Sequence, residues 1–222
     1  MYTILIADDH PLFREALRGA VQRVLPQATL FEAEGVEALY ALLESHASAD
    51  LLLMDLNMPG AHGFNALVHL RALYPELPVA VVSAREEPSV MRRALDHGAL
   101  AFIPKSLSPD TIGQALRTVL DGERWAPASV AAAPDTAPEE REVAQRLREL
   151  TPQQFRVMQL LASGQLNKQI AYDLGVSEAT IKAHITAILR KLGVTNRTQA
   201  VLMAGRLAVE PERMVLPEDE RD

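Results

Sequence analysis

Five short apolar runs, each followed by a stretch of helical periodicity, constrain the fold of the first 121 residues more than any other feature. The runs occupy Thr3–Ala7, Thr29–Ala33, Leu51–Met54, Val79–Val82 and Ala101–Ile103. Each is too short for a helix and lies next to Asp, Gly, Pro or Ser, which is typical of strands. This alternation predicts an α/β fold in which helices cover both faces of a parallel sheet.

Composition and charge narrow the classes of protein. The 222 residues suit two modest domains, and 48% are hydrophobic, which argues against wholesale disorder. The absence of cysteine excludes disulfides and thiol catalysis and fits a reducing cytoplasm. No apolar run approaches the roughly 18 residues of a membrane span, and the N-terminus lacks the basic segment of a signal peptide. We therefore expect a cytoplasmic protein with no membrane partner.

The second half of the chain differs in pattern and charge. Residues 122–147 are expected to form a linker rich in alanine and proline that ends in a charged helix. From Thr151 the periodicity predicts four short helices, at about 152–163, 167–174, 178–192 and 196–208, with Asn167 and Ser177 as candidate N-caps. Between Leu150 and Ala208, seven basic and two acidic residues give a charge of +5, against −12 for the rest of the chain. A polyanion is the expected partner of this basic module, which we place at 148–208, before an acidic tail at 209–222.

Acidic residues follow two of the predicted strands. Asp8 and Asp9 end the first strand, and Asp55 ends the third. In a doubly wound sheet of order 2-1-3-4-5 these strands are neighbours, so the three carboxylates converge where ligands bind. An all-oxygen cluster suits Mg²⁺. Ser83 after the fourth strand and Lys105 after the fifth add a hydroxyl and an ammonium group, which are the parts that a phosphorylated carboxylate needs.

The segments that carry these residues resemble a response-regulator receiver domain. They are Ala7–His10, Met54–Gly60, Val82–Ala84 and Pro104-Lys105, and the resemblance covers residues 1–121. It implies the flavodoxin-like five-stranded fold and implies that Asp55 accepts phosphate from a sensor histidine kinase. It also implies that Mg²⁺ is held by Asp8, Asp9, Asp55 and the Asn57 carbonyl group. By the same resemblance, Ser83 and Lys105 contact the phosphoryl group and Phe102 is the switch aromatic.

A helix-turn-helix pattern lies within residues 167–193. The turn, Leu174–Ser177, contains a glycine and a serine N-cap, and a long second helix follows it. The apolar stripe of this helix faces a core, so its small and basic residues on the opposite side can approach base edges.

The same module resembles the LuxR-type (NarL/FixJ) DNA-binding domain. The resemblance rests on Leu150–Pro152, Asn167–Ala171, Leu174–Ser177, Thr180–His184 and Lys191–Ala200. It implies that Lys182, Ala183 and Thr186 face the major groove. It assigns contacts with the DNA backbone to Thr180, Asn167, Lys168, Ser177, Lys191 and Arg197. Gln154-Phe155 stand where the family carries an acidic residue, so an internal ion pair is expected to be missing.

The two resemblances together imply a two-component response regulator of the NarL/FixJ family, not an enzyme, whose phosphorylation controls DNA binding and transcription. We expect a homodimer after phosphorylation, and RNA polymerase is a further candidate partner. Before phosphorylation, we expect the receiver to cover part of the helix that carries Lys182.

Two other functions compete with this interpretation. An aspartate-nucleophile phosphatase of the haloacid-dehalogenase kind needs a second acid two residues after the nucleophile, where this chain has Asn57. A protein-binding regulator would use the helical module as a bundle with a solvated basic face. DNA binding that weakens as salt rises separates this second alternative from the leading one.

Overall fold

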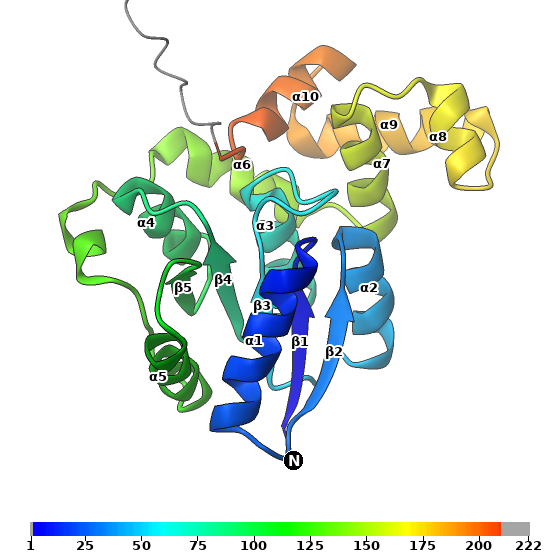
Figure 1. Ribbon diagram of the computed structural model, residues 1–222. Coiled ribbons are helices and arrows are strands. Elements are labelled where there is room, and N and C mark those ends of the chain that lie inside the picture. Colours follow the sequence, from blue (N-terminus) through cyan, green and yellow to red (C-terminus); the bar gives the residue numbers. More distant parts are fainter. Residues whose placement is uncertain (1, 210–222) are drawn as a thin grey trace, which may run out of the picture.

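The computed structural model describes residues 2–209, so the predicted acidic tail lies outside the described residues except for Val209. Its first part is a five-stranded parallel sheet of order β2-β1-β3-β4-β5, which confirms the predicted order (Figure 1). The strands are β1 (Thr3–Ala7), β2 (Thr29–Ala33), β3 (Leu51–Met54), β4 (Val79–Ser83) and β5 (Ala101–Pro104). Ala7 pairs with Met54 across β1 and β3, so the residues that follow them, Asp8 and Asp55, are neighbours.

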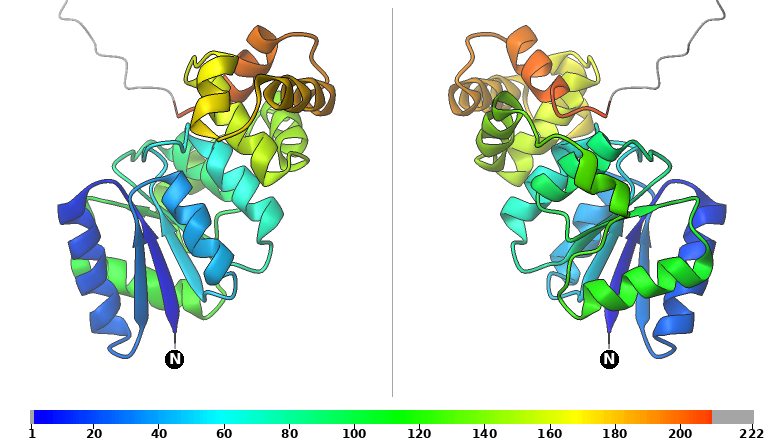
Figure 2. Two further views of the ribbon diagram at one scale, coloured as in Figure 1. Left: turned by 90° about the vertical axis from the view of Figure 1, so that its right-hand side faces the viewer. Right: turned by 90° about the vertical axis from the view of Figure 1, so that its left-hand side faces the viewer.

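Helices cover both faces of the sheet, as the alternation predicts (Figure 2). One face carries α1 (Pro11–Val24) and α5 (Pro109–Leu120), and the other carries α2 (Val36–Ser45), α3 (Phe64–Leu73) and α4 (Pro88–Asp96). Alternate residues of each strand enter the two separate cores, with Ile4 and Ile6 facing α1 and α5 while Leu5 faces α2 and α3. All strand residues of β3, β4 and β5 are buried, because a parallel sheet has no solvated face.

Between Pro138 and Val209, where the description of the chain ends, the second part consists of five helices. They are α6 (Pro138–Arg148), α7 (Pro152–Ala162), α8 (Asn167–Asp173), α9 (Glu178–Leu192) and α10 (Arg197–Gly205). Ser177 caps α9, since its hydroxyl oxygen accepts a hydrogen bond from the Thr180 amide at 3.1 Å. The prediction of Asn167 as an N-cap is wrong. Asn167 is the first residue of α8, and the Gln169 side chain instead accepts a hydrogen bond from the Leu166 amide at 2.7 Å.

The segment predicted as a linker packs along the receiver. The Trp125 carbonyl group accepts a hydrogen bond from the Phe102 amide at 3.0 Å, and the Trp125 amide donates to Leu100 at 3.2 Å. A 3₁₀-helix, Ala128–Ala132, then packs against α4 and buries Val130. The buried Thr136 donates from its amide and its hydroxyl group to one carboxylate oxygen of Asp96. Alanine and proline without apolar periodicity gave no sign of these contacts, several of which use backbone atoms.

The second part rests on the first above the carboxyl ends of the strands, on the side of α2 and α3 (Figures 1 and 2). His69 of α3, which is fully buried, lies at the centre of this contact. Its ring stacks on Phe155 of α7 with centroids 3.9 Å apart. Its Nε2 donates to the Leu150 carbonyl group at 3.1 Å, and its Nδ1 atom forms a hydrogen bond of 2.5 Å with the Tyr40 hydroxyl group. Both ring nitrogens therefore have hydrogen-bond partners inside this contact.

Acidification is expected to weaken this contact. Burial lowers the pKa of His69 from 6.5 to about 4, although the hydrogen bond to Leu150 raises it. Between pH 6.5 and 4, His69 is protonated in the unfolded chain but stays neutral in the folded chain. The contribution of His69 to the free energy of unfolding is therefore complete above pH 6.5 and falls as the pH drops toward 4. At pH 5 the loss is about 2 kcal/mol. Urea unfolding of the wild type and of His69→Gln, at pH 7.5 and 5, should show the smaller loss in the variant, and equal losses would contradict the linkage.

Candidate functional site

Asp8, Asp55 and Lys105 meet at the carboxyl ends of β1, β3 and β5. The two aspartates are almost fully buried. The Lys105 Nζ atom lies 2.6 Å from Asp8 Oδ2 and 2.8 Å from Asp55 Oδ2, so one ammonium group bridges both carboxylates. Burial alone lowers the pKa of Lys105, but hydrogen bonds to the two carboxylates and their charges outweigh it and raise the pKa. Lys105 is therefore a fixed positive charge beside Asp55.

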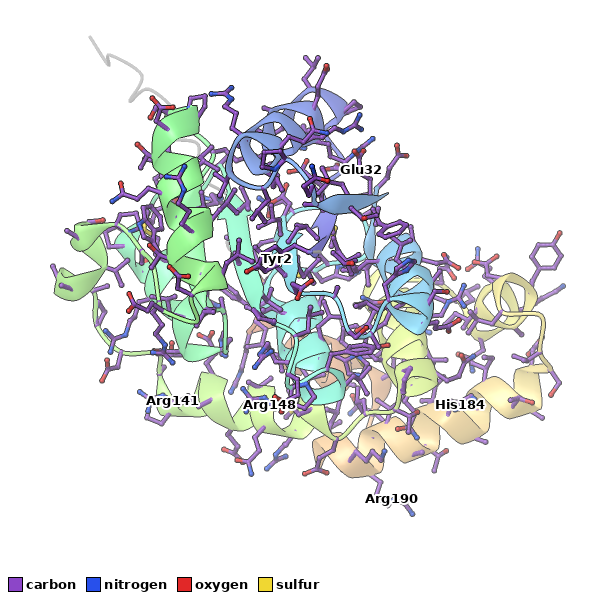
Figure 3. All side chains as sticks on the ribbon, turned by 90° about the horizontal axis from the view of Figure 1, so that it is seen from below. Tyr2, Glu32, Arg141, Arg148, His184 and Arg190 are labelled. Carbon is purple, nitrogen blue, oxygen red and sulfur yellow. The ribbon has the colours of Figure 1, made fainter. Side chains whose placement is uncertain are left out.

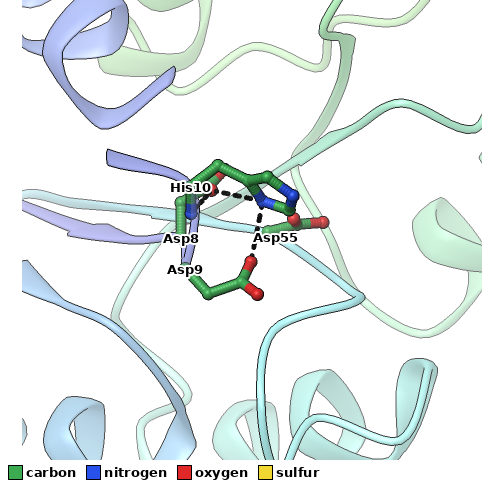
Figure 4. A group of neighbouring side chains, drawn as sticks. All are labelled: Asp8, Asp9, His10 and Asp55. Atoms are coloured by element: carbon green, nitrogen blue, oxygen red, sulfur yellow. Dashed lines mark hydrogen bonds and ion pairs between the residues drawn. The ribbon is translucent and has the colours of Figure 1, made fainter. Parts of the chain in front are cut away.

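Asp9 and His10 complete the acidic cluster (Figure 4). His10 is mostly exposed, and its Nδ1 atom lies 2.8 Å from Asp9 Oδ1 and 3.3 Å from Asp8 Oδ1. Candidate ligand atoms of Asp8, Asp9, His10 and Asp55 all lie within 4.8 Å of one another. Three carboxylates this close form a donor set that fits a hard divalent cation such as Mg²⁺. The sequence interpretation placed these acids together but missed the pairing of His10 with Asp9.

The other predicted residues of this edge lie at the ends of their strands. The amide of the exposed Asn57 donates to Asp55 Oδ1 at 3.1 Å. Ser83 is fully buried at the end of β4, and its hydroxyl oxygen accepts from the Arg85 amide at 3.1 Å. Phe102 is fully buried within β5, where it packs in the core on the side of α4.

An open cleft of about 570 Å³ gives access to Asp55. It is lined by His10, Leu12, Phe13, Asp55, Asn57, Ala84 and Lys105. The cation of Lys105 also lies 4.6 Å from the centre of the Phe13 ring, which fixes its approach to the cleft. A buried carboxylate beside a fixed ammonium group, reachable from solvent, can take up a group that carries negative charge.

The predicted base-reading face of α9 is open to solvent. Lys182, Ala183 and Thr186 are exposed, and Figure 3 shows Arg190 of the same helix pointing away from the body of the molecule. The expectation that the receiver covers part of this helix is therefore wrong. The receiver instead contacts α6, Leu150, α7 and the segment that follows α10, where Phe155 and the Leu207 carbonyl group offer a ring and an acceptor to α3.

The six residues assigned to the DNA backbone fall into two groups. Lys168, Ser177 and Thr180 are exposed and Asn167 is half-buried, all near the amino ends of α8 and α9. Lys191 and Arg197 already bind within the module. Lys191 donates to the Glu149 carbonyl group and to Gln154 Oε1, each at 2.7 Å. Arg197 donates to the Gln165 carbonyl group at 2.6 Å.

Comparisons with known proteins agree with the division of the chain into a receiver domain and a helical DNA-binding module. Residues 4–117 match the response regulator receiver domain, and residues 148–204 match the bacterial regulatory proteins of the luxR family. The glycerol metabolism activator of Pseudomonas putida is 40% identical over 92% of this chain and 96% of its own length. The nitrate/nitrite response regulator NarL of Escherichia coli is 35% identical over 90% of this chain and 93% of its own.

Solved structures show the same architecture. A structure of the response regulator RcsB of Salmonella typhimurium covers 91% of this chain and 98% of its own, with a TM-score of 0.54 and 26% identity. The structure of an RcsB–DNA complex covers 93% and 99%, with a TM-score of 0.55 and 25% identity. No helix within residues 2–209 is both long and apolar enough to cross a membrane. The relatives are regulators of transcription rather than phosphatases, and this chain belongs to the response regulators that join a receiver domain to a LuxR-type DNA-binding domain.

Proposed function

We propose that Asp55 is the residue that a sensor histidine kinase phosphorylates, and that phosphorylation controls sequence-specific DNA binding by α9. The observation that carries the proposal is the Lys105 ammonium group, which bridges Asp8 and Asp55 at the base of an accessible cleft. Asp55 is suited to be the nucleophile, because its carboxylate oxygens carry lone pairs and the residue lines the cleft. Lys105 has the position to stabilise the charge of the incoming group.

The transfer itself exchanges one bond to phosphorus for another. A carboxylate oxygen of Asp55 attacks the phosphorus of a phosphohistidine, the new O–P bond forms, and the N–P bond breaks as the imidazole leaves. Mg²⁺ held by Asp8, Asp9, Asp55 and the Asn57 carbonyl group would neutralise charge on the phosphoryl oxygens. Ser83 and Lys105 are the proposed contacts of the bound phosphoryl group, and Phe102 is the proposed switch residue beside them.

The DNA interface follows from what α9 leaves exposed. Lys182, Ala183 and Thr186 are proposed to enter the major groove, while the exposed backbone candidates near the amino ends of α8 and α9 hold phosphates. Lys191 and Arg197 are proposed to support the module that presents this face, in addition to their predicted backbone contacts. A homodimer on two half-sites is the proposed active form, with RNA polymerase as a further partner. Because the protein would bind DNA, the proposal includes the expected cytoplasmic location.

Phosphorylation is expected to tighten DNA binding. A coupling of about 1–3 kcal/mol, typical of allostery, corresponds to roughly 5–150-fold. The test is fluorescence anisotropy with a matched site, beside sedimentation velocity, on the full chain with and without a small phosphodonor and Mg²⁺. Asp55→Asn treated in the same way is the control. Equal affinities, with no dimer that depends on phosphate, would show that the receiver does not control DNA binding.

A further inference from the structure

The loop between β3 and α3 touches both the acidic cluster and the DNA-binding module. The loop begins at Asp55, whose side chain accepts a hydrogen bond of 3.1 Å from the Asn57 amide. Three residues further on, the Gly60 carbonyl group accepts a hydrogen bond from the Gln159 side chain of α7. The Phe64 amide, at the start of α3, donates to the Leu207 carbonyl group at 2.8 Å. A path of ten residues therefore runs from the proposed phosphorylation site to the other domain.

The contact at the end of this loop joins two helix termini. The first amides of α3 and the last carbonyl groups of α10 have no partners inside their own helices. Asn65, which is buried, donates to the Ala204 carbonyl group at 3.1 Å and to the His62 carbonyl group at 2.7 Å. The amino end of α3 and the carboxyl end of α10 also carry partial charges of opposite sign. The Phe64 amide and the Asn65 side chain thus bind two carbonyl groups, one in α10 and one just beyond it, across the domain boundary.

The loop holds an uncommon backbone conformation in order to make this contact. Gly60, His62 and Gly63 have φ values of 83°, 47° and 71°, and His62 is the only residue other than glycine with a positive φ in the described part of the chain. A Cβ atom on Gly63 would lie 2.5 Å from the Leu207 carbonyl oxygen and from the Val209 amide nitrogen. Residues 207–209 therefore sit directly on the Gly63 backbone, where only glycine leaves room.

We propose that this loop transmits the state of the Asp55 pocket to the DNA-binding module, by releasing residues 204–209 when a phosphoryl group and a divalent cation are bound. The inference rests on the proposed function of Asp55. The Asn57 carbonyl group is a proposed ligand of the cation, and only two residues separate it from Gly60. The loop is constrained at the pocket, at its left-handed residues and at the contact of Gly63 with residues 207–209. A change of backbone conformation at the pocket therefore disrupts the contact at the other end of the loop.

Arg93 of α4 holds the same segment from the other side. Its guanidinium group donates to the Arg206 carbonyl group at 3.1 Å and to the Ala208 carbonyl group at 3.2 Å, and pairs with Glu140 of α6 at 2.8 Å. A signal that travels through Ser83 and α4 would therefore reach residues 206–208 as well. The experiment must separate the loop from this second path, so its variants alter the loop contacts and leave Arg93 unchanged.

The first measurement is hydrogen exchange of the full chain without phosphodonor. Gly63→Ala should raise exchange in residues 204–209 by about 5-fold or more, because its new methyl group displaces their backbone. Gly122→Ala is the matched control, since Gly122 has φ 82° with open space around it. It carries the same backbone penalty and should leave that segment unchanged. Equal exchange of residues 204–209 in Gly63→Ala and in the wild type would contradict the close contact of this segment with Gly63.

The second measurement adds Mg²⁺ with beryllium trifluoride, a phosphoryl analogue, and compares it with Mg²⁺ alone. The wild type should bind the analogue and expose residues 204–209. Linkage is reciprocal, so Gln159→Ala, which weakens docking from the α7 side and lies outside the pocket, should bind the analogue more tightly. Gln153→Ala on the same helix is the control and should bind it as the wild type does.

The outcomes distinguish this inference from the function on which it rests. If the wild type does not bind the analogue at Asp55, both are wrong. If it binds while residues 204–209 keep their protection, only the transmission through the loop is wrong. The same holds if release occurs but Gln159→Ala and Gln153→Ala have equal affinities, because the signal then travels by the α4 path.

Discussion

Asp55→Asn should abolish uptake of the phosphoryl group. The amide is similar in size to the carboxylate but is too weak a nucleophile to form the O–P bond. Intact-mass spectra of the wild type with a small phosphodonor should show one added phosphoryl group that is labile in acid and that forms only when Mg²⁺ is present. The mass of the Asp55→Asn protein should stay unchanged.

One further variant tests a neighbour of Asp55, and a second is its control. Asp9→Asn should slow uptake without abolishing it, because it removes one oxygen charge from the proposed cation site and keeps the nucleophile. Asp121→Asn, an exposed acid at the end of α5, is the control and should label as the wild type does. Undiminished labelling of Asp55→Asn would place the phosphoryl group on another residue.

Lys182→Ala should cost about 1–3 kcal/mol of binding free energy at a matched DNA site, or roughly 5–150-fold in affinity. Lys182 is exposed near the amino end of α9, where a long basic side chain can reach the edge of a base. The loss should be specific, so affinity for a scrambled site should change far less. Fluorescence anisotropy of the full chain with both duplexes at one salt concentration measures the two losses.

Lys168→Ala serves as the comparison for Lys182→Ala. Lys168 is exposed in the first turn of α8, and its proposed partner is a phosphate, which carries no sequence information. The variant should weaken binding to matched and scrambled sites alike and reduce the dependence on salt. If Lys182→Ala gave the same uniform loss, Lys182 would be a phosphate contact and another residue would read the base.

The sheet and its acidic edge could be predicted from sequence because local patterns encode them. Each strand is a short apolar run beside a turn residue, and the charged residues follow at fixed positions, so topology alone brings Asp8 and Asp55 together. The N-cap Ser177 could be predicted for the same reason, because a serine directly before an apolar helical pattern is a local signal. The prediction for Asn167 failed because α8 begins one residue earlier than expected, with Leu166 at the N-cap position and its amide bound by the Gln169 side chain.

The contact between the domains could not be predicted, because several of its hydrogen bonds use backbone atoms that every residue has. The acceptors for Asn65, Phe64 and Gln159 are all backbone carbonyl groups. His69 stands in an apolar stretch of α3, so its position suggested no partner on the distant Phe155. The expected cover over Lys182 failed for the same reason, since charge pattern alone does not show which backbone groups remain free to bind the receiver.

Trp125 gives the protein an optical reporter at a defined place. It is the only tryptophan in the chain, it is half-buried, and its backbone pairs with β5 on either side of Ala101. Its ring packs among residues of the α1 and α5 core, whereas the segment that follows it runs to α4 and α6. Emission from this single indole therefore reports whether the connecting segment stays attached to the receiver edge, with no background from the DNA-binding helices and no need for a dye.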